Sequence, residues 1–111
     1  MFLSTIKMAI PVKKHNEALK ILRSITLQTR DHPGCLSCSI YRDLEENNIL
    51  MLQEKWETEE HLALHVRSGE YRNLLLVMEM SVKEPEVRFD AISSSTGIET
   101  IEKIRTTVRM K

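Results

Sequence analysis

Alternating apolar and polar residues predict four short strands in this chain. In the first, Ile6, Met8 and Ile10 share one face, and Pro11 ends the segment. The same period of two recurs further along, so the predicted strands are residues 2–10, 35–42, 48–57 and 87–91. A polar turn over residues 43–47 joins the second and third strands, which are therefore expected to form an antiparallel hairpin.

Helical spacing of apolar residues marks the segments between these strands. Ala18, Leu22 and Ile25 predict an amphipathic helix over residues 14–30, which the Pro-Gly turn at residues 31–34 ends. A second helix is predicted over residues 58–67, with Thr58 as its N-cap.

Ser68 and Gly69 interrupt the second helix, and a further helical segment follows. Its apolar residues surround the helix axis, so we expect burial on more than one side; they are Tyr71, Leu74, Leu75, Leu76, Val77, Met78 and Met80.

The order of elements is β-α-β-β-α-β, which predicts an α+β, ferredoxin-like fold: a four-stranded antiparallel sheet with helices on one face. The third strand carries apolar residues on both faces, because Leu50 and Leu52 oppose Ile49 and Met51. Helices on one side would leave the second face uncovered, and an exposed apolar face on a small domain marks an association surface. We therefore expect a homodimer that packs sheet against sheet.

The chain is expected to divide into one domain over residues 1–95 and a C-terminal amphipathic arm over residues 96–111. Three serines at 93–95 separate the two parts, and Ile98, Ile101, Ile104 and Val108 follow at near-helical spacing. We expect this arm to pack across the partner subunit.

Composition narrows the function classes. The 111 residues include 16 Lys+Arg and 16 Asp+Glu, a balance that offers no electrostatic basis for binding nucleic acid or an anionic membrane. Five aromatic residues give little surface for stacking bases. No apolar run has the length of a membrane span, and Ser4, Thr5 and Lys7 interrupt the N-terminal stretch, so we expect a cytoplasmic protein.

Two cysteines, Cys35 and Cys38, form a CxxC motif. A zinc site needs about four ligands, and His32 adds only one more, so no metal is predicted. Residues three apart on a regular strand project to opposite faces, so the two thiols are expected to diverge. We expect reduced packing residues, with a redox-sensitive thiol as the alternative.

Several motifs in the middle of the chain resemble those of the antibiotic biosynthesis monooxygenase (ABM) domain. They are Pro33-Gly34-Cys35 before the second strand, Tyr41-Arg42 at its end, Glu54-Lys55-Trp56 at the end of the third, and His65 in the second helix. The resemblance covers residues 2–95 and implies a dimeric α/β barrel. Similar domains include quinol and polyketide monooxygenases that need no metal or flavin, heme-degrading enzymes, isomerases of small phosphorylated sugars, and members without known activity.

His65 is the candidate catalytic residue, because imidazole can donate or accept a proton near neutral pH. It forms an i, i+4 pair with His61, as in the zinc-protease motif HExxH. That motif requires Glu directly after the first His, and Leu62 stands there, so a metalloprotease is not predicted. The alternative for His65 is a structural hydrogen bond. His61 and His15 are expected at the surface.

Three residues are candidates for substrate binding: Trp56, Tyr71 and Glu54. The indole N–H of Trp56 and the phenol of Tyr71 can anchor oxygen atoms, although both residues also fit a core role. Glu54 shares a sheet face with Trp56, where it would either pair with Arg42 on the neighbouring strand, which we expect, or act as an acid or base.

These residues favour a cofactor-independent monooxygenase that acts on a small aromatic or quinol-like substrate in a pocket between sheet and helices. A deprotonated substrate of this kind can itself supply electrons to O₂. Heme degradation is disfavoured, because the first strand has no Asn, His65 replaces the Trp of the heme-degrading branch, and Leu75 replaces its iron ligand. A non-catalytic ligand-binding or stress-response module and a small-molecule isomerase remain as alternatives.

Overall fold

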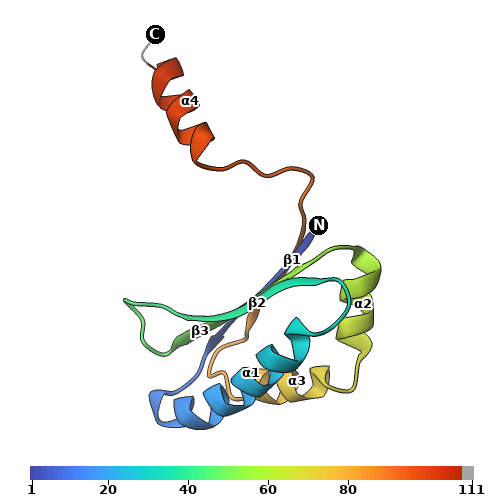
Figure 1. The fold of residues 1–111 in the computed structure, drawn as a ribbon. Coiled ribbons are helices and arrows are strands. Elements are labelled where there is room, and N and C mark those ends of the chain that lie inside the picture. The colour runs from blue at the N-terminus through green and yellow to red at the C-terminus, as the bar shows by residue number, and fades with distance from the viewer. Residues whose placement is uncertain (109–111) are drawn as a thin grey trace.

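The computed structural model describes residues 1–108, with side-chain environments through residue 106, and contains one four-stranded antiparallel sheet (Figure 1). The sheet order is β2-β3-β1-β4, so β2 and β4 are its edges and the sheet is not closed. The strands are β1 (Phe2–Ala9), β2 (Cys35–Arg42), β3 (Ile49–Trp56) and β4 (Glu86–Ala91). These strands and this order confirm the predicted ferredoxin-like α+β fold.

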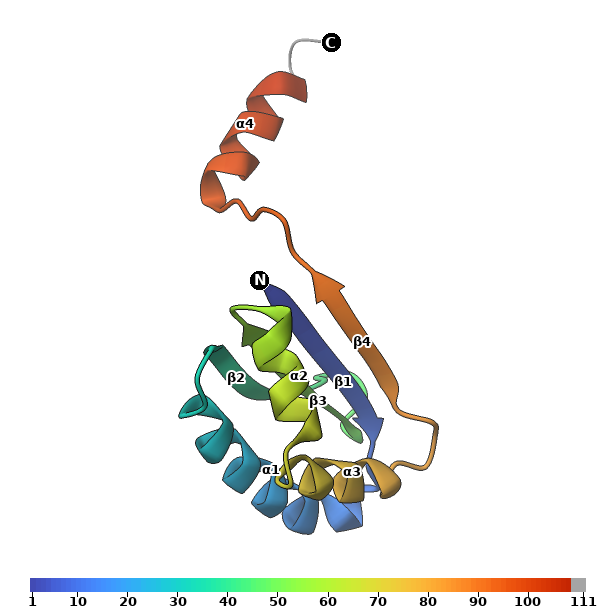
Figure 2. The ribbon, with the colours of Figure 1, turned by 90° about the vertical axis from the view of Figure 1, so that its right-hand side faces the viewer.

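Three helices cover one face of this sheet, as Figures 1 and 2 show. They are α1 (His15–Arg30), α2 (Glu59–Arg67) and α3 (Tyr71–Glu79), and a short 3₁₀ turn, η1 (Val12–Lys14), leads into α1. The predicted interruption at Ser68 and Gly69 is confirmed, since the extended backbone of Ser68 ends α2 and α3 begins at Tyr71. Among residues 1–108, no helix is long and apolar enough to span a membrane.

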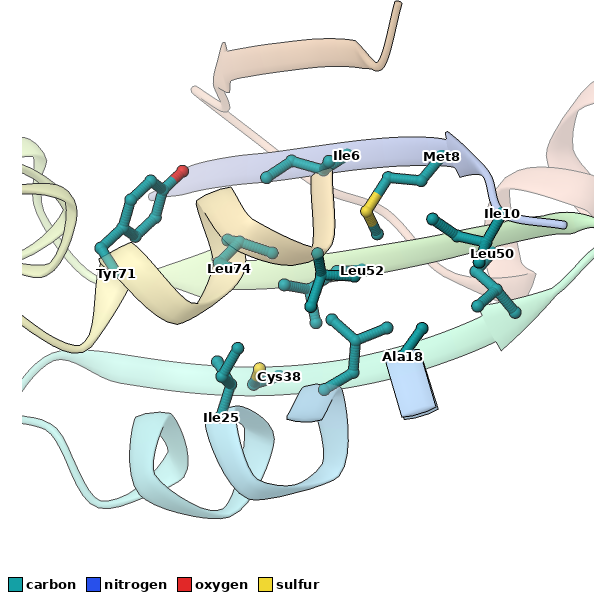
Figure 3. Close-up of a cluster of buried hydrophobic side chains, with 12 residues drawn as sticks. Ile6, Met8, Ile10, Ala18, Ile25, Cys38, Leu50, Leu52, Tyr71 and Leu74 are labelled. Carbon is teal, nitrogen blue, oxygen red and sulfur yellow. The ribbon is translucent and has the colours of Figure 1, made fainter. Parts of the chain in front are cut away.

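The hydrophobic core lies between the sheet and helices α1 and α3 (Figure 3). Because side chains alternate along a strand, every second residue of β1 and β3 points toward the helices, and most of these residues are apolar. Apolar residues at every third or fourth position of α1 and α3 pack against them. The cluster consists of Ile6, Met8, Ile10, Ala18, Leu22, Ile25, Cys38, Leu50, Leu52, Tyr71, Leu74 and Val77. Tyr71 lies at one end of the cluster, toward α2.

The prediction that the third helical segment is buried on several sides was wrong. Only Tyr71, Leu74 and Val77 of α3 are buried, whereas Leu75 and Leu76 are exposed. The buried residues are three apart and lie on one side of the helix, so Leu75 and Leu76 are rotated out of the core.

The expected surface position of His15 was also wrong. Its side chain is buried, and its Nε2 atom lies 2.7 Å from the carbonyl oxygen of Ile10. The turn η1 folds the start of α1 back onto the end of β1, which places the ring beside a carbonyl that it can satisfy.

A β-bulge in β2 overturns the prediction that the two thiols diverge. Cys35 pairs with Trp56 and Cys38 with Glu54, so the extra residue between them brings both cysteines to the same sheet face. Both are free, and Cys38 belongs to the core. Burial, followed by the nearby carboxylate of Glu54, raises the pKa of Cys38 to about 12, so this side chain is an unreactive thiol at neutral pH.

The sheet face turned away from the helices is only partly apolar. Leu3 and Met51 lie on it beside Lys55 and Lys7, according to the strand register. Tyr41, opposite Met51, is exposed, as is Leu36 at the bulge. This uncovered face keeps the sheet-to-sheet homodimer as a prediction.

The C-terminal segment forms a helix, α4 (Ile98–Val108), which projects away from the rest of the chain in both views (Figures 1 and 2). The helical spacing predicted for the arm is present from Ile98. Residues 109–111 of the predicted arm lie outside the described residues.

Candidate active site

His65 lies in a buried position on α2. Thr58 fixes the start of this helix, since its hydroxyl accepts a hydrogen bond from the backbone N–H of His61 at 3.1 Å. His65 follows one turn later and is 3% exposed. Three rings surround its imidazole, with centroid distances of 4.7 Å to Trp56, 5.3 Å to Tyr71 and 5.6 Å to His32.

A buried carboxylate holds both His65 and Trp56. Glu54 is 1% exposed; its Oε1 accepts a hydrogen bond from Trp56 Nε1 at 3.0 Å, and its Oε2 lies 3.3 Å from His65 Nε2. Residues 54 and 56 share a face because strand residues alternate. The indole N–H, considered above as a ligand anchor, is thus bound to Glu54.

The predicted pairing of Glu54 with Arg42 was wrong. On β2 the residue opposite Glu54 is Cys38, whereas Arg42 lies opposite Leu50 at the far end of the hairpin and is exposed. The buried donors that face this carboxylate are therefore Trp56 Nε1 at 3.0 Å and His65 Nε2 at 3.3 Å. A buried carboxylate requires such partners, because it has lost its hydration.

The contact with Glu54 determines which nitrogen of His65 can act as a base. A neutral imidazole that donates its Nε2–H to a carboxylate keeps a lone pair on Nδ1. Nδ1 of His65 is buried and has no hydrogen-bond partner among the described residues. This pair has the arrangement of a base oriented by a carboxylate.

Tyr71 contacts His65 with perpendicular ring planes, at 87°. Burial, and then the charge of Glu54, raises the pKa of Tyr71 to about 12. Its phenol therefore stays protonated at neutral pH and can only donate or accept hydrogen bonds.

His32 and Glu70 extend the cluster toward the surface. His32 Nε2 lies 2.9 Å from Glu70 Oε2, although the two groups are not aligned as a hydrogen bond, and both side chains are partly exposed. The sequence indicated His32 only as a possible zinc ligand. No sequence pattern indicated its true place, which follows from the pairing of Cys35 with Trp56, since this pairing brings the turn before β2 to the end of β3.

A cavity of about 200 Å³ lies beside His65. Its lining residues are His32, Pro33, Trp56, His61, Leu64, His65 and Ser68. The structure thus places Trp56 and His65 on the cavity wall, whereas Glu54 and Tyr71 contact His65. His61, predicted at the surface, is partly buried and lines the cavity, and its Nδ1 lies 2.7 Å from the Thr58 hydroxyl.

Gly34 allows the turn before β2 to approach α2. Its φ angle is +81°, a conformation that other residues rarely adopt, and its carbonyl accepts a hydrogen bond from Glu57 N at 2.8 Å. A Cβ atom at this position would overlap the ring of His61. The second glycine near the site, Gly69, has open space around its Cα.

We predict that Gly34→Ala lowers the free energy of unfolding by about 2–3 kcal/mol, since it adds left-handed backbone strain to the overlap with His61. Urea denaturation checks this, with Gly69→Ala as the matched control, which should change stability by less than about 1 kcal/mol. Equal stability of the two variants would show that the turn does not need glycine.

Fold and site together define a class: a ferredoxin-like α+β domain in which a strand-borne Glu-x-Trp holds a helix histidine beside a small cavity. The family model for antibiotic biosynthesis monooxygenase (ABM) matches residues 1–75. The chain therefore belongs to the ABM family, whose model and similar structures support a monooxygenase-like role at the level of the family. No curated protein matches the chain.

Solved structures agree on the fold. A conserved protein from Methanosarcina mazei is 27% identical, with a TM-score of 0.76 over 80% of this chain and 89% of that one. A candidate antibiotic biosynthesis monooxygenase from Deinococcus radiodurans is 17% identical, with a TM-score of 0.80 over 88% and 98%. A Mycobacterium tuberculosis protein is 22% identical, with a TM-score of 0.71 over 87% and 100%.

Proposed function

We propose that this protein is a cofactor-independent monooxygenase that oxidises a small hydroquinol in the cavity beside His65. One observation carries the proposal: His65 lines the cavity while its Nδ1 atom is buried and unpartnered, and its Nε2 atom faces the carboxylate of Glu54. A buried acceptor without a donor is costly unless a ligand supplies the hydrogen bond. A substrate hydroxyl would supply it.

The residues of the site account for the first step of this chemistry. Nδ1 of His65 would accept the proton of the substrate hydroxyl, and Glu54 would stabilise the imidazolium that forms. The electron-rich quinolate would then react with O₂ without help from another redox group. His32, 5.6 Å from His65 and partly exposed, would provide a route for the proton to solvent.

The overall reaction balances without an external reductant. A hydroquinol of formula C₆H₆O₂ and one O₂ give a hydroxyquinone, C₆H₄O₃, and one H₂O. Two electrons come from oxidation of the quinol to the quinone and two from conversion of a ring C–H to C–OH. O₂ takes all four electrons, so one of its oxygen atoms enters the ring and the other becomes water.

The size of the cavity favours a one-ring substrate. Its volume of about 200 Å³ is below the range of roughly 300–1,000 Å³ that is typical of sites for drug-sized ligands. Trp56 and Leu64 provide apolar surface for a ring, and His65 and His61 provide polar atoms for its hydroxyls. We infer further that the outer sheet face pairs two copies, since it is partly apolar and uncovered.

Oxygen consumption with a panel of one-ring hydroquinols tests the proposal. We expect uptake of one O₂ per product with no accumulation of H₂O₂. Absence of uptake above background across the panel would overturn it, and stoichiometric H₂O₂ would indicate an oxidase instead. A ligand that raises the melting temperature without turnover would favour a binding module, and proton exchange with deuterated water without O₂ uptake would favour an isomerase.

A further inference from the structure

A second hollow lies on the opposite side of α2 from the active-site cavity. It is an apolar groove of about 490 Å³ between α2 and the strands β1 and β4. We call it the α2–β4 groove; its lining residues are Phe2, Glu59, Leu62, Ala63, Val66, Arg67, Phe89 and Ala91. Phe89 is 50% exposed, so a large aromatic side chain in this groove faces solvent.

The apolar stripe of α4 is equally uncovered. Ile98, Ile101 and Ile104 repeat every three residues, so they lie along one side of the helix, and they are 74%, 58% and 56% exposed. Three exposed isoleucines in a row exceed the scattered apolar residues of an ordinary surface. An amphipathic helix with this spacing is suited to an apolar groove.

We propose that α4 of a second copy of this chain docks in the α2–β4 groove. The charges at its ends favour one orientation. Glu59 lines the groove where α2 begins, and Arg67 lines it where α2 ends. Arg105 borders the isoleucine stripe near the C-terminal end of α4, so antiparallel packing against α2 brings it to Glu59, whereas parallel packing would bring it to Arg67.

The connection to α4 favours a second copy over the chain's own groove. The N–H of Ile92 still pairs with the carbonyl of Met1, which leaves residues 93–97 as the linker. Strand β4 ends opposite Phe2, which pairs with Trp56, close to where α2 begins. To pack antiparallel in its own groove, α4 must start at the other end of α2, about 13 Å away, so residues 93–97 would have to run back along α2, whereas α4 projects away from its own domain (Figures 1 and 2).

A second copy supplies the helix without this reversal of the linker. Exchange of α4 between two chains related by a two-fold axis makes the same contact twice. The groove is separate from the cavity beside His65, so this contact does not depend on the proposed oxygenase activity.

Disulfide trapping tests the proposal. In a Cys35→Ser background, Ala63→Cys in the groove and Ile101→Cys on α4 are combined, and the protein is oxidised at micromolar concentration. We expect a covalent dimer on a non-reducing gel as the main product. A matched control replaces Ala63→Cys by Leu27→Cys on the exposed side of α1, and it should give little dimer. A monomer with an internal disulfide, or no cross-link above the control, would overturn the proposal.

A second measurement does not rely on cysteines. Ile101→Glu is exposed in its own chain and should leave the fold intact, but it should weaken self-association at least tenfold by sedimentation. Thr106→Glu adds the same charge on the opposite side of α4 and should leave self-association unchanged. Equal association of the two variants would contradict docking through the isoleucine stripe.

Discussion

His65→Gln is expected to lower kcat/KM for hydroquinol oxygenation by about 10²–10⁴-fold, the usual contribution of a positioned general base. Glutamine is the informative replacement, because its amide N–H can still donate to the buried carboxylate of Glu54, whereas alanine would leave that carboxylate with Trp56 as its remaining donor. The variant should therefore fold and bind substrate while it lacks a group that accepts the proton.

The pH dependence of the reaction provides an independent readout of the same change. Wild-type activity should fall at acidic pH, where a base becomes protonated, and this acidic limb should be absent from the residual activity of His65→Gln. Tyr71 should not contribute to the acidic limb of the pH–rate profile, since burial raises its pKa to about 12.

Arg72→Gln, on the exposed side of α3, is the control for this experiment and should retain wild-type rates. If His65→Gln also retained full activity while remaining folded, His65 would not be the base, and the proposed chemistry would lose its first step.

The sequence was sufficient to predict the fold and three of the residues around His65. Period-two alternation in β3 placed Glu54 and Trp56 on one face, and this prediction depends only on local periodicity. His65 and Tyr71 were identified from the resemblance to the ABM domain and from the chemistry of their side chains, and the structure brings them together with Glu54 and Trp56.

Features that depend on register or on a bulge could not be predicted. Glu54 was assigned to Arg42 because both are polar residues on neighbouring strands, but cross-strand partners follow from the register, which pairs Glu54 with Cys38. The bulge at Leu36 reverses the expected directions of the cysteines for the same reason. No local sequence pattern predicts either the register or the bulge.

The role of His32 also could not be predicted from the sequence, because it depends on a contact between the turn before β2 and α2, which are far apart in the chain. The turn before β2 comes within reach of α2 only because position 34 is a glycine with a positive φ angle, since the ring of His61 leaves no room there for a Cβ atom. A single Pro-Gly pair predicts a turn but not which helix that turn contacts. The cavity, formed between this turn and α2, was therefore located only by its histidine.

Glu54→Gln is expected to damage both stability and activity, because this carboxylate faces two donors in the core. A carboxylate accepts hydrogen bonds from Trp56 and His65 at once, whereas a glutamine offers one oxygen and must turn its NH₂ group toward the other donor. Whether His65 keeps its proton on Nε2, facing the NH₂ group, or moves it to the buried and unpartnered Nδ1, one buried donor is left unpaired. This should lower the free energy of unfolding by about 1–3 kcal/mol in urea denaturation. Glu57→Gln, an exposed neighbour, should have little effect.

The effect of Glu54→Gln on catalysis follows from the tautomer of His65. If the glutamine NH₂ faces Nε2, the imidazole must accept there and carry its proton on Nδ1, so the atom proposed as the base becomes a donor. We therefore expect a fall in kcat of about 10²–10⁴-fold, as when the carboxylate of a catalytic triad is replaced by an amide.

The double variant His65→Gln/Glu54→Gln distinguishes a shared role from separate ones. If Glu54 acts through His65, the second substitution should cost little once the first is made, because residues that work as a unit are strongly non-additive. Losses that multiply would show instead that Glu54 contributes to the reaction by itself. Unchanged kcat in Glu54→Gln, at a stability sufficient for full folding, would contradict the assignment of this carboxylate as the group that positions His65.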